Sequence, residues 1–409
     1  MKIRSITSFY DPGASGASAT LDHLTNLTSV ARSRFESAGY EVQTTRLATV
    51  PFPGLVPSCC DESAIHLVKL LEHEASSHGF AYISFGPALP EYPDSYRLIP
   101  TMLAETENAF FSGVVATADG QVHLPAVRAC AEIIAAAATI TPDGFANLRF
   151  SAIANLPPGG PFFPSGYHAP GQPPRFAIAA EAADVVYQAF SSAQTLVEAR
   201  RTALDALEAH AQALEAIAES IRREFDVAFG GFDFSPAPHP SEGRSLGGAL
   251  AALGVPALGQ NGSLAAAAFL ADLLDRGRWP RAGFNGLMMP VLEDAVLAAR
   301  SAAGDLTVKD LLLYSAVCGT GLDTVPLPGD STPDQLSAVL LDVAALSIRL
   351  DKPLTARLMP IPGKIAGDPT DFVFDYFANG RVMALPSSGL SGLLAGEESF
   401  DLKPRHTRK

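Results

Sequence analysis

The chain has 409 residues, of which 47% are hydrophobic, and its 43 acidic and 29 basic side chains give a formal net charge of -14. This composition predicts a folded protein with a large core, and the negative charge argues against binding to nucleic acid or to an anionic membrane, since both need a basic surface. The N-terminal residues lack the apolar segment of a signal peptide and no run of eighteen apolar residues offers a membrane span, so we expect a cytoplasmic protein.

The first half of the chain alternates strands with helices. The periodicity predicts, in chain order, a strand over 3–9, a helix over 21–38, a strand over 41–47, a helix over 61–78, a strand over 80–85, a helix over 99–108, a strand over 110–117, a helix over 125–138 and a strand over 145–154. Such alternation favours an α/β barrel or a doubly wound sheet. In both folds the functional residues gather at strand ends.

Residues 156–174 interrupt this alternation with seven prolines, four glycines and several aromatic residues. Prolines and glycines at this density cannot continue a helix or a central strand. We interpret the segment as an ordered, lid-like loop over a pocket, or alternatively as a crossing whose aromatic side chains plug the end of a barrel. His168 is its one group that titrates near neutral pH, and a hydrogen-bonded structural role is the alternative to catalysis.

The second half is predicted to contain more helix. After a strand over 176–183, we expect helices over 193–225, 245–253 and 264–274, and a further helix that follows Glu293 and Asp294 and ends at 302. Helices over 306–317 and 332–351, a strand over 354–360 and a basic tail over 403–409 complete the chain. The charged face of the longest helix is either a solvated face or a dimer seam. Pro326 and Pro328 predict a loop between the helices that end at 317 and begin at 332.

Cys318 stands between an apolar run and Gly319, Gly321 and Asp323. A thiol, two glycines that let a ligand approach the backbone, and a carboxylate could supply a nucleophile, an anion cradle and a base. The alternative is that Cys318 is a small buried hydrophobic residue. The four cysteines, which include the adjacent pair at 59 and 60, fit neither a disulfide framework nor a zinc site, so we expect reduced thiols.

Asp233 and Ser235 follow one another on one face of a strand-like stretch that ends in three prolines and contains His239. An acid among aromatic residues is costly to desolvate and must find a partner, so Asp233 is a candidate base or, alternatively, a loop cap or a buried hydrogen-bond acceptor. Ser235 and His239 are candidate substrate-binding residues, as are Asn155 and Glu105.

Three further sites concern charged ligands. Asn261 begins a helix whose free amides could bind an anion, although simple capping is the commoner role. Glu293 and Asp294 precede another helix, where acids ordinarily complement the dipole but could also help to hold calcium or magnesium. Arg357 is a candidate clamp for a carboxylate or phosphate. No organic cofactor is expected.

Six segments occur in the order found in one uncharacterised protein family: 3–7, 103–106, 162–168, 233–238, 290–294 and 318–323. The chain therefore resembles domain of unknown function 711, also called uncharacterised protein family 0210, over nearly its whole length. The resemblance implies a single large barrel over 1–409, similar in fold to glycyl-radical enzymes such as pyruvate formate-lyase. It also implies homodimers, with some members encoded beside a small amino-acid-binding regulatory domain, but it implies no activity.

The chain departs from those patterns in two places. Glycyl-radical enzymes carry a glycine near the C-terminus where the nearest run here, 381–385, has Ala384, so radical catalysis of that kind is not expected. Acidic residues that family members carry before the Pro-Phe pair are absent from 156–160, which indicates a diverged substrate.

We therefore expect a non-radical enzyme that acts on a small polar metabolite by proton transfer or covalent catalysis, as a lyase, isomerase or cyclase. A role in specialised metabolism would fit the diverged loop. Cys318 would be nucleophile or proton donor, Asp233 and Asp323 bases or orienting acids, and His168 an acid or base. The alternatives are a non-catalytic metabolite-binding or regulatory protein on the same barrel, and cation-assisted chemistry through Glu293 and Asp294.

Overall fold

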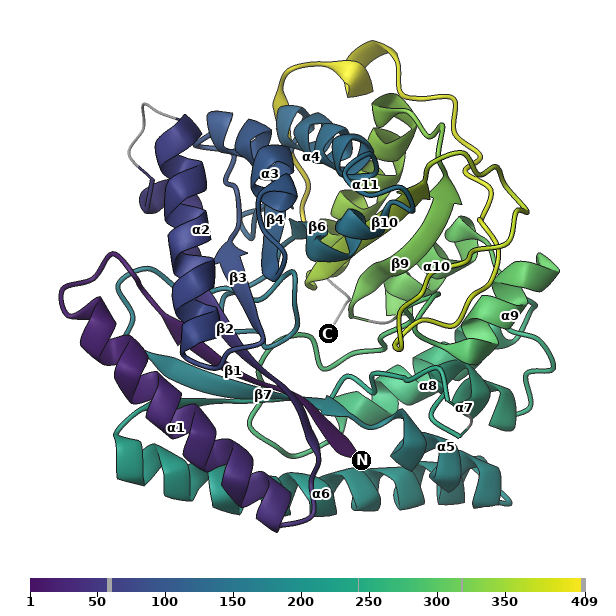
Figure 1. Cartoon of the computed structure of the whole chain (residues 1–409). Coiled ribbons are helices and arrows are strands. Elements are labelled where there is room, and N and C mark those ends of the chain that lie inside the picture. The colour runs from purple at the N-terminus through teal and green to yellow at the C-terminus, as the bar shows by residue number, and fades with distance from the viewer. Residues whose placement is uncertain (57–60, 242, 318, 406–409) are drawn as a thin grey trace.

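One curved, mixed sheet organises the molecule in the computed structural model, which describes residues 1–56, 61–241, 243–317 and 319–405 (Figure 1). Its strands are β1 (Lys2–Tyr10), β2 (Val42–Pro51), β3 (Tyr82–Gly86), β4 (Ala109–Ala116), β5 (Gln121–His123), β6 (Phe150–Ala154), β7 (Arg175–Glu181), β8 (Ala228–Asp233), β9 (Gly321–Pro328), β10 (Leu354–Ile361) and β11 (Ser399–Asp401). The main path runs β8-β7-β1-β2-β3-β4-β6-β10-β9, and β5 and β11 form a side branch on β4.

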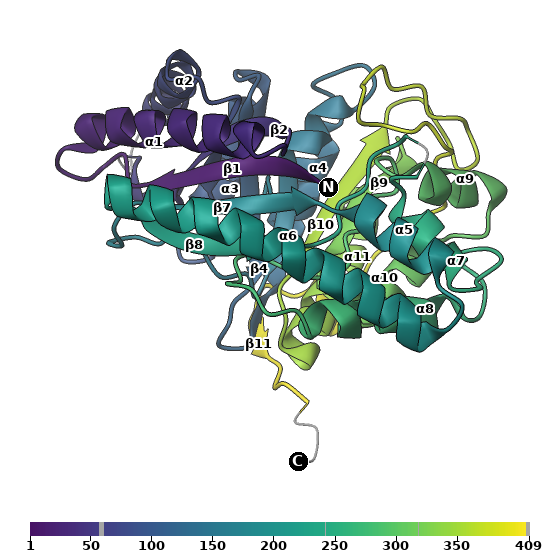
Figure 2. The same ribbon diagram turned by 90° about the horizontal axis from the view of Figure 1, so that it is seen from below.

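Most neighbouring strands of the main path are parallel, as the strand and helix alternation predicted. The exceptions are β7 beside β1 and β10 beside β6, which pair antiparallel. The helices lie on the outside of the curved sheet, where most of them contact its strands and several of those after β7 pack on other helices instead (Figures 1 and 2). They are α1 (Ala17–Ser37), α2 (Asp61–Ser77), α3 (Asp94–Ala104), α4 (Leu124–Ala137), α5 (Ala183–Ser192), α6 (Leu196–Phe225), α7 (Leu246–Ala252), α8 (Ser263–Asp275), α9 (Ala295–Ala303), α10 (Val308–Val317) and α11 (Pro333–Leu350).

The α/β class is confirmed, but a closed barrel is not: the sheet is open, with β8 and β9 at its two ends. The segment 281–290 lies between these ends and forms no further strand: its β-bridges to them are isolated, Phe232 with Arg281 and Pro290 with Asp323. Pro326 and Pro328 on β9 have no N–H to donate to another strand, which suits β9 to an edge. The sheet therefore curves around an interior without closing its hydrogen-bond ladder.

The predicted loop after residue 323 is wrong, because residues 321–328 form β9 and pair with β10. The prolines that argued against a strand are tolerated because β9 pairs on one side only. The helix expected over 193–225 is confirmed as α6, which Thr195 begins by accepting from the backbone N–H of Glu198, whereas α5 just before it was not expected. α6 buries one stripe of alanine and leucine against the rest of the chain, and whether its charged face is solvated or forms a dimer seam stays a prediction.

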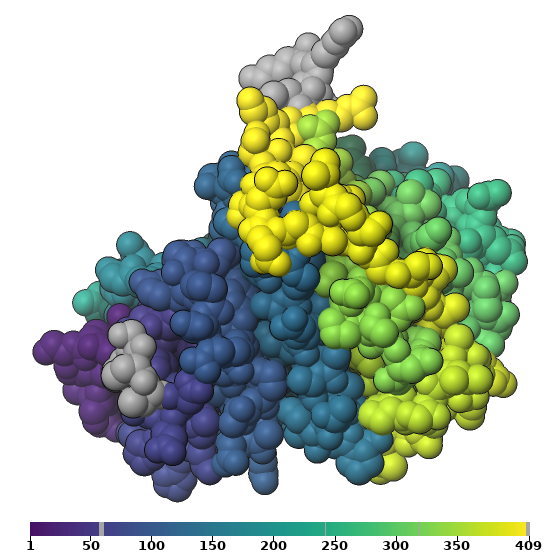
Figure 3. All heavy atoms as spheres, turned by 90° about the horizontal axis from the view of Figure 1, so that it is seen from above, coloured from purple at the N-terminus to yellow at the C-terminus, as the bar shows by residue number. Residues whose placement is uncertain are grey.

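The C-terminal part of the chain lies on the surface. Figure 3 shows it, in yellow, crossing the helices of the blue and light green segments. The start of the predicted basic tail is held, since Arg405 N donates to the carbonyl of Arg349, and residues 406–409 lie outside the described residues. None of the helices that the structure describes is both long and apolar enough to cross a lipid bilayer.

Candidate functional site

A cavity of about 120 Å³ lies against the inner face of the sheet. Its polar lining comes mainly from the beginnings of the strands rather than from their C-terminal ends: Arg4, Thr44, Arg46, Tyr82, Ser151, Thr355 and Arg357, with Asp323 from β9 and Glu293 from the segment before α9. The polar lining is thus near strand ends, as expected, but at the N-terminal ends rather than at the C-terminal ends that α/β folds commonly use. A strongly curved sheet turns its inward-facing side chains toward one another along the whole strand, so residues near the strand starts can also converge.

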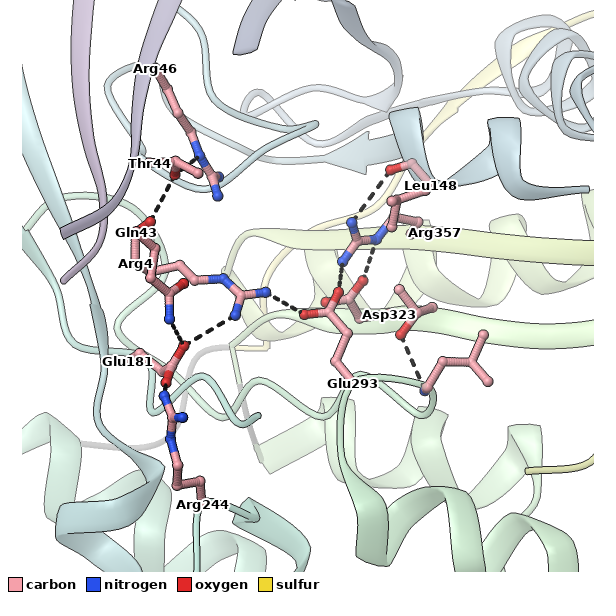
Figure 4. A network of polar contacts seen from close by, with 12 residues as sticks. Arg4, Gln43, Thr44, Arg46, Leu148, Glu181, Arg244, Glu293, Asp323 and Arg357 are labelled. Carbon is pink, nitrogen blue, oxygen red and sulfur yellow. Dashed lines mark hydrogen bonds and ion pairs between the residues drawn. The ribbon is translucent and has the colours of Figure 1, made fainter. Parts of the chain in front are cut away.

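The charged side chains of the cavity form one connected network, drawn in Figure 4. Glu293 lies between two arginines, accepting from Arg4 at 2.6 Å and from Arg357 at 2.9 Å. Arg357 also donates from Nε to Oδ1 of Asp323 at 2.6 Å. At the other end, Glu181 accepts from Arg4 at 3.2 Å and from Arg244 and Gln43.

The position of Asp323 depends on an irregularity in the edge strand. Leu322 pairs with Ala356 and Val325 with Leu358, so two residues of β9, Asp323 and Thr324, stand opposite Arg357 alone. Thr324 adopts a left-handed φ of 42°, which is strained for a β-branched residue. Bulges of this type redirect side chains, and this one places the carboxylate beside Arg357.

Burial raises the pKa of Asp323 above its usual value of 3.8, the charge of Arg357 opposes that shift, and the charge of Glu293 adds to it. Two carboxylates therefore share one guanidinium at the cavity wall.

Arg46 differs from the other arginines of the network because no carboxylate of the described residues contacts it. Its Nε donates to Oγ1 of Thr44 at 2.9 Å, and its guanidinium carbon lies 5.8 Å from the centre of the Tyr82 ring and 5.3 Å from that of Phe163. The residue is 9% exposed. Burial, aided by the charge of Arg4, lowers the pKa of Arg46 to about 9, so the guanidinium keeps its charge at neutral pH.

The remaining wall is apolar and aromatic, with Phe110, Phe162, Phe163, Phe284 and Met288 lining it. Phe162, Phe163 and Ser165 belong to the loop over 156–174, which therefore forms part of the cavity wall. Ser84 Oγ donates to the carbonyl of Pro164 at 3.1 Å and fixes the loop to β3. A partly apolar cavity with a few charged groups is the usual form of a small-molecule site.

The family to which the chain belongs follows from sequence comparison. A family model described as "Uncharacterised ACR (DUF711)" matches residues 1–387. The chain belongs to the DUF711 family. A UPF0210 protein of Pyrobaculum arsenaticum is 34% identical over 370 residues, covering 86% of this chain and 80% of that relative. UPF0210 proteins of Methanosarcina acetivorans and Acetivibrio thermocellus are each 28% identical, over 82% and 91% of this chain and 75% and 88% of their own lengths.

The names of these UPF0210 relatives specify no activity, so membership of the DUF711 family confirms the resemblance without assigning a reaction. The chemistry must be argued from the cavity. Of the candidates chosen from sequence, the structure brings Asp323, Glu293 and Arg357 together there. The other candidates that the structure describes lie outside the lining of this cavity.

Asp233 and Ser235 do not line the cavity. They form a buried hydrogen-bonded cluster with Phe284 and Asn285, the Asp233 cluster. Oδ1 of Asp233 accepts from the N–H and hydroxyl of Ser235 at 2.9 and 2.6 Å and from Asn285 N at 3.0 Å, while Oδ2 accepts from Phe284 N at 2.7 Å. Burial raises the pKa of Asp233, and these hydrogen bonds oppose the shift. The arrangement matches the alternative of a buried acceptor, and it fixes the backbone that carries Phe284.

The Asp233 cluster lies next to the glycine-containing segment around residue 319. Gly286 N donates to Oγ of Ser235 at 3.0 Å, and a Cβ on Gly286 would lie 2.7 Å from Cα of Gly319. Gly321 has a φ of 97°, and a Cβ there would lie 2.1 Å from the carbonyl oxygen of Thr355, so strand pairing requires this glycine. Cys318 lies outside the described residues, as do Cys59 and Cys60, and its role stays a prediction.

His168 does not line the cavity. Its N–H donates to the carbonyl of Thr49 at 2.8 Å, its Nε2 lies 3.0 Å from the carbonyl of Gln172, and its ring lies beside Phe9. Burial lowers its pKa. These contacts match the structural alternative.

The remaining binding candidates are also outside the cavity lining. Glu105 is exposed and pairs with Lys69 at 2.7 Å, and Asn155 donates to Asp351 at 3.4 Å. Asn261 is exposed just before α8. His239 reaches the site only indirectly, with its ring 5.8 Å from that of Tyr376, which lines the cavity.

Glu293 and Asp294 face different partners. Asp294 caps α9 by accepting from Val296 N and Leu297 N, and it joins α7 through Ser245 and Gly247. Burial raises its pKa. Within the described ranges, no group of three or more His, Cys, Asp or Glu side chains could hold a metal ion. The expected calcium or magnesium site stays a prediction without geometric support.

Sequence reasoning missed Arg4, Arg46, Glu181 and Ser151 as site residues. A usable signal existed, because Arg4 stands in a strand between Ile3 and Ile6, and Arg46 directly precedes the apolar run of β2. Charged residues are rarely buried without a partner, so a charge inside a buried strand indicates a partner or a ligand.

Proposed function

We propose that the protein is an enzyme that binds a small polar metabolite in the cavity and acts on it by proton transfer, as a lyase, isomerase or cyclase without a radical. The observation that carries the proposal is the carboxylate pair at the cavity wall: Asp323 and Glu293 share Arg357, and burial raises the pKa of Asp323. Groups with perturbed pKa values in a cavity are candidates for acid and base roles.

In this proposal ionised Asp323 takes a proton from a C–H or O–H group of the metabolite, and the negative charge passes to the metabolite. The unpaired Arg46 stabilises that charge by electrostatic attraction. Protonated Asp323 then returns the proton to another atom of the same molecule in an isomerase or cyclase, or to the departing group in a lyase. Arg357 and Glu293 orient Asp323 throughout.

Covalent catalysis by Cys318 is a separate proposal, as are the homodimer, the cytoplasmic location and a function as a metabolite-binding or regulatory protein. The binder has its own support: Asp323 and Glu293 are both engaged by arginines, as in a structural network. Proton transfer distinguishes the two functions.

The test needs no known substrate. A small-molecule extract of microbial cells is incubated in D₂O with wild type, with Asp323→Asn and with Asp330→Asn, in which an exposed aspartate near the same strand is changed. Mass spectrometry is expected to find a metabolite that gains deuterium or changes mass with wild type and Asp330→Asn but not with Asp323→Asn. Retention of a metabolite without either change would assign the non-catalytic binder instead.

A further inference from the structure

We propose that the ligand of this cavity is a small monocarboxylic acid with a second oxygen function, its carboxylate held by Arg46 and its hydroxyl or carbonyl group by Ser151. This inference rests on the proposed function only in taking the cavity as the reactive site. It names the substrate class, which neither the family nor the proton-transfer argument specifies.

Arg46 carries the first step. Its Nε is occupied by Thr44, and no hydrogen bond from its two terminal nitrogens is made to the described residues. The aromatic rings of Tyr82 and Phe163 lie within 6 Å of its guanidinium carbon and hold the plane in place. The free end of the group therefore presents two N–H donors side by side at the cavity, which is the geometry that binds a carboxylate through both oxygens.

Ser151 supplies the second contact. Its side chain is 1% exposed, its Oγ has no hydrogen-bond partner in the described structure, and the residue lines the same cavity. A buried hydroxyl without a partner carries a desolvation cost that a ligand oxygen would remove. β3 and β4 separate β2 from β6, so Ser151 and Arg46 start from strands about 14 Å apart and reach different parts of one ligand.

The net charge of the network favours a ligand that carries a single negative charge. Arg4, Arg46, Arg244 and Arg357 meet Glu181, Glu293 and Asp323, which leaves one positive charge, at Arg46. A monocarboxylate neutralises it. A phosphate dianion would add a second negative charge in a cavity that already contains Glu293 and Asp323.

The apolar wall sets the body of the ligand. Phe163 lies beside Arg46, the ring centre of Phe110 is 5.7 Å from that of Phe163, and Phe284 and Met288 also line the cavity. A short hydrocarbon chain between the carboxylate and the second oxygen would fill this space, whereas a sugar would leave hydroxyl groups against aromatic carbon.

The test measures binding by saturation-transfer NMR and calorimetry with four small probes: 3-hydroxybutyrate, butyrate, 1,3-butanediol and propyl phosphate. Wild type is expected to bind 3-hydroxybutyrate best, butyrate several-fold less well, and the diol and phosphate at least tenfold less well. Equal or tighter binding of propyl phosphate would overturn the assignment of a monocarboxylate.

Variants locate the two contacts. Arg46→Met is expected to lose at least tenfold in affinity for both carboxylates, and Arg46→Lys to lose less because it keeps the charge but not the fork. Arg276→Met, at an exposed position directly after α8, is expected to bind as wild type. Ser151→Ala is expected to bind butyrate normally and to lose the preference for 3-hydroxybutyrate. Unchanged binding by folded Arg46→Met and Arg46→Lys would overturn the role of Arg46.

Asp323→Asn separates this inference from the proposed function. If wild type binds the carboxylates but no proton transfer is found, the proposed enzyme fails and the carboxylate site stands. If proton transfer depends on Asp323 but the Arg46 variants bind the carboxylates as wild type does, the carboxylate site fails and the proton-transfer role of Asp323 stands.

Discussion

Arg357 and Arg46 line the same cavity, but Arg357 donates to Glu293 and Asp323, whereas Arg46 meets no carboxylate among the described residues. Arg357 compensates two buried negative charges and therefore stabilises the unliganded fold. Arg46 is a buried charge without a carboxylate among the described residues, so its burial is costly to the unliganded fold. A site that is costly to the unliganded fold is a common property of binding sites.

This difference predicts opposite effects on unfolding. Arg357→Met leaves Asp323 without its arginine and Glu293 with Arg4 alone, and it is expected to lower the free energy of unfolding by about 3–5 kcal/mol. Arg46→Met removes a buried cation that meets no carboxylate of the described residues, and it is expected to change the free energy of unfolding by less than about 1 kcal/mol or to raise it, because it loses two cation–π contacts and one hydrogen bond to Thr44. Denaturant titration of both variants measures this, and an equal loss in both would contradict it.

Asp323 predicts a dependence on pH. Burial raises its pKa above 3.8, and Arg357, Glu293 and Arg4 are the charged groups that act on it. Its protonated form is therefore favoured in the fold, so the stability of wild type relative to Asp323→Asn is greatest at low pH and falls as pH rises from 3.8 through the folded pKa.

The same shift affects catalysis. Because the base must be ionised, the proposed proton transfer is expected to rise with pH through a pKa above 3.8. Melting temperatures of both proteins from pH 4 upward test the first expectation, and deuterium incorporation by wild type tests the second. A melting-temperature difference that grows in favour of wild type with pH would contradict the raised pKa.

At Thr324, glycine is expected to be a more stable replacement than alanine, which is the reverse of the order expected within a regular strand. Because its φ of 42° is left-handed, Thr324→Gly is expected to be more stable than Thr324→Ala by about 1 kcal/mol. At Thr45, which lies in the regular pairing of β1 with β2, alanine is expected to be better than glycine. Denaturant unfolding of the four variants checks both orders, and alanine above glycine at both sites would show that the bulge is unstrained.

Disrupting the Asp233 cluster is expected to lower the stability of the fold. Asp233→Asn replaces one accepting oxygen with a donor that faces other donors, so we expect a loss of about 1–3 kcal/mol in unfolding free energy. Because Asp233 does not line the cavity, the affinity of the folded fraction for carboxylates is expected to stay within a few-fold of wild type. A stable variant that has lost binding would place Asp233 in the site after all.

Helices were predictable from sequence because their signals are local. The helix expected over 61–78 is α2 over 61–77, and the one expected over 332–351 is α11 over 333–350. Thr332 begins α11 with a capping box to Gln335, three residues away. Apolar periodicity also determined the α/β class, since each signal involves residues within a few turns of chain.

The site could not be found in the same way, because its partners are distant in sequence. Arg4 and Glu293 are 289 residues apart, and nothing near either residue indicates the other. Asp233 and Asp323 look equally suitable as catalytic acids in the sequence. In the structure Asp233 accepts from four donors in the buried Asp233 cluster, whereas Asp323 lies beside Arg357 at the cavity.

The sequence by itself determined the class of fold, the family and most helices, because periodicity and caps act over short stretches of chain. Only the tertiary structure decided that the sheet is open, that a proline-containing segment is its edge, and that Arg46 has no carboxylate partner within the described chain. Strand order and burial set those outcomes, since they determine which charges meet and which one is left for a ligand.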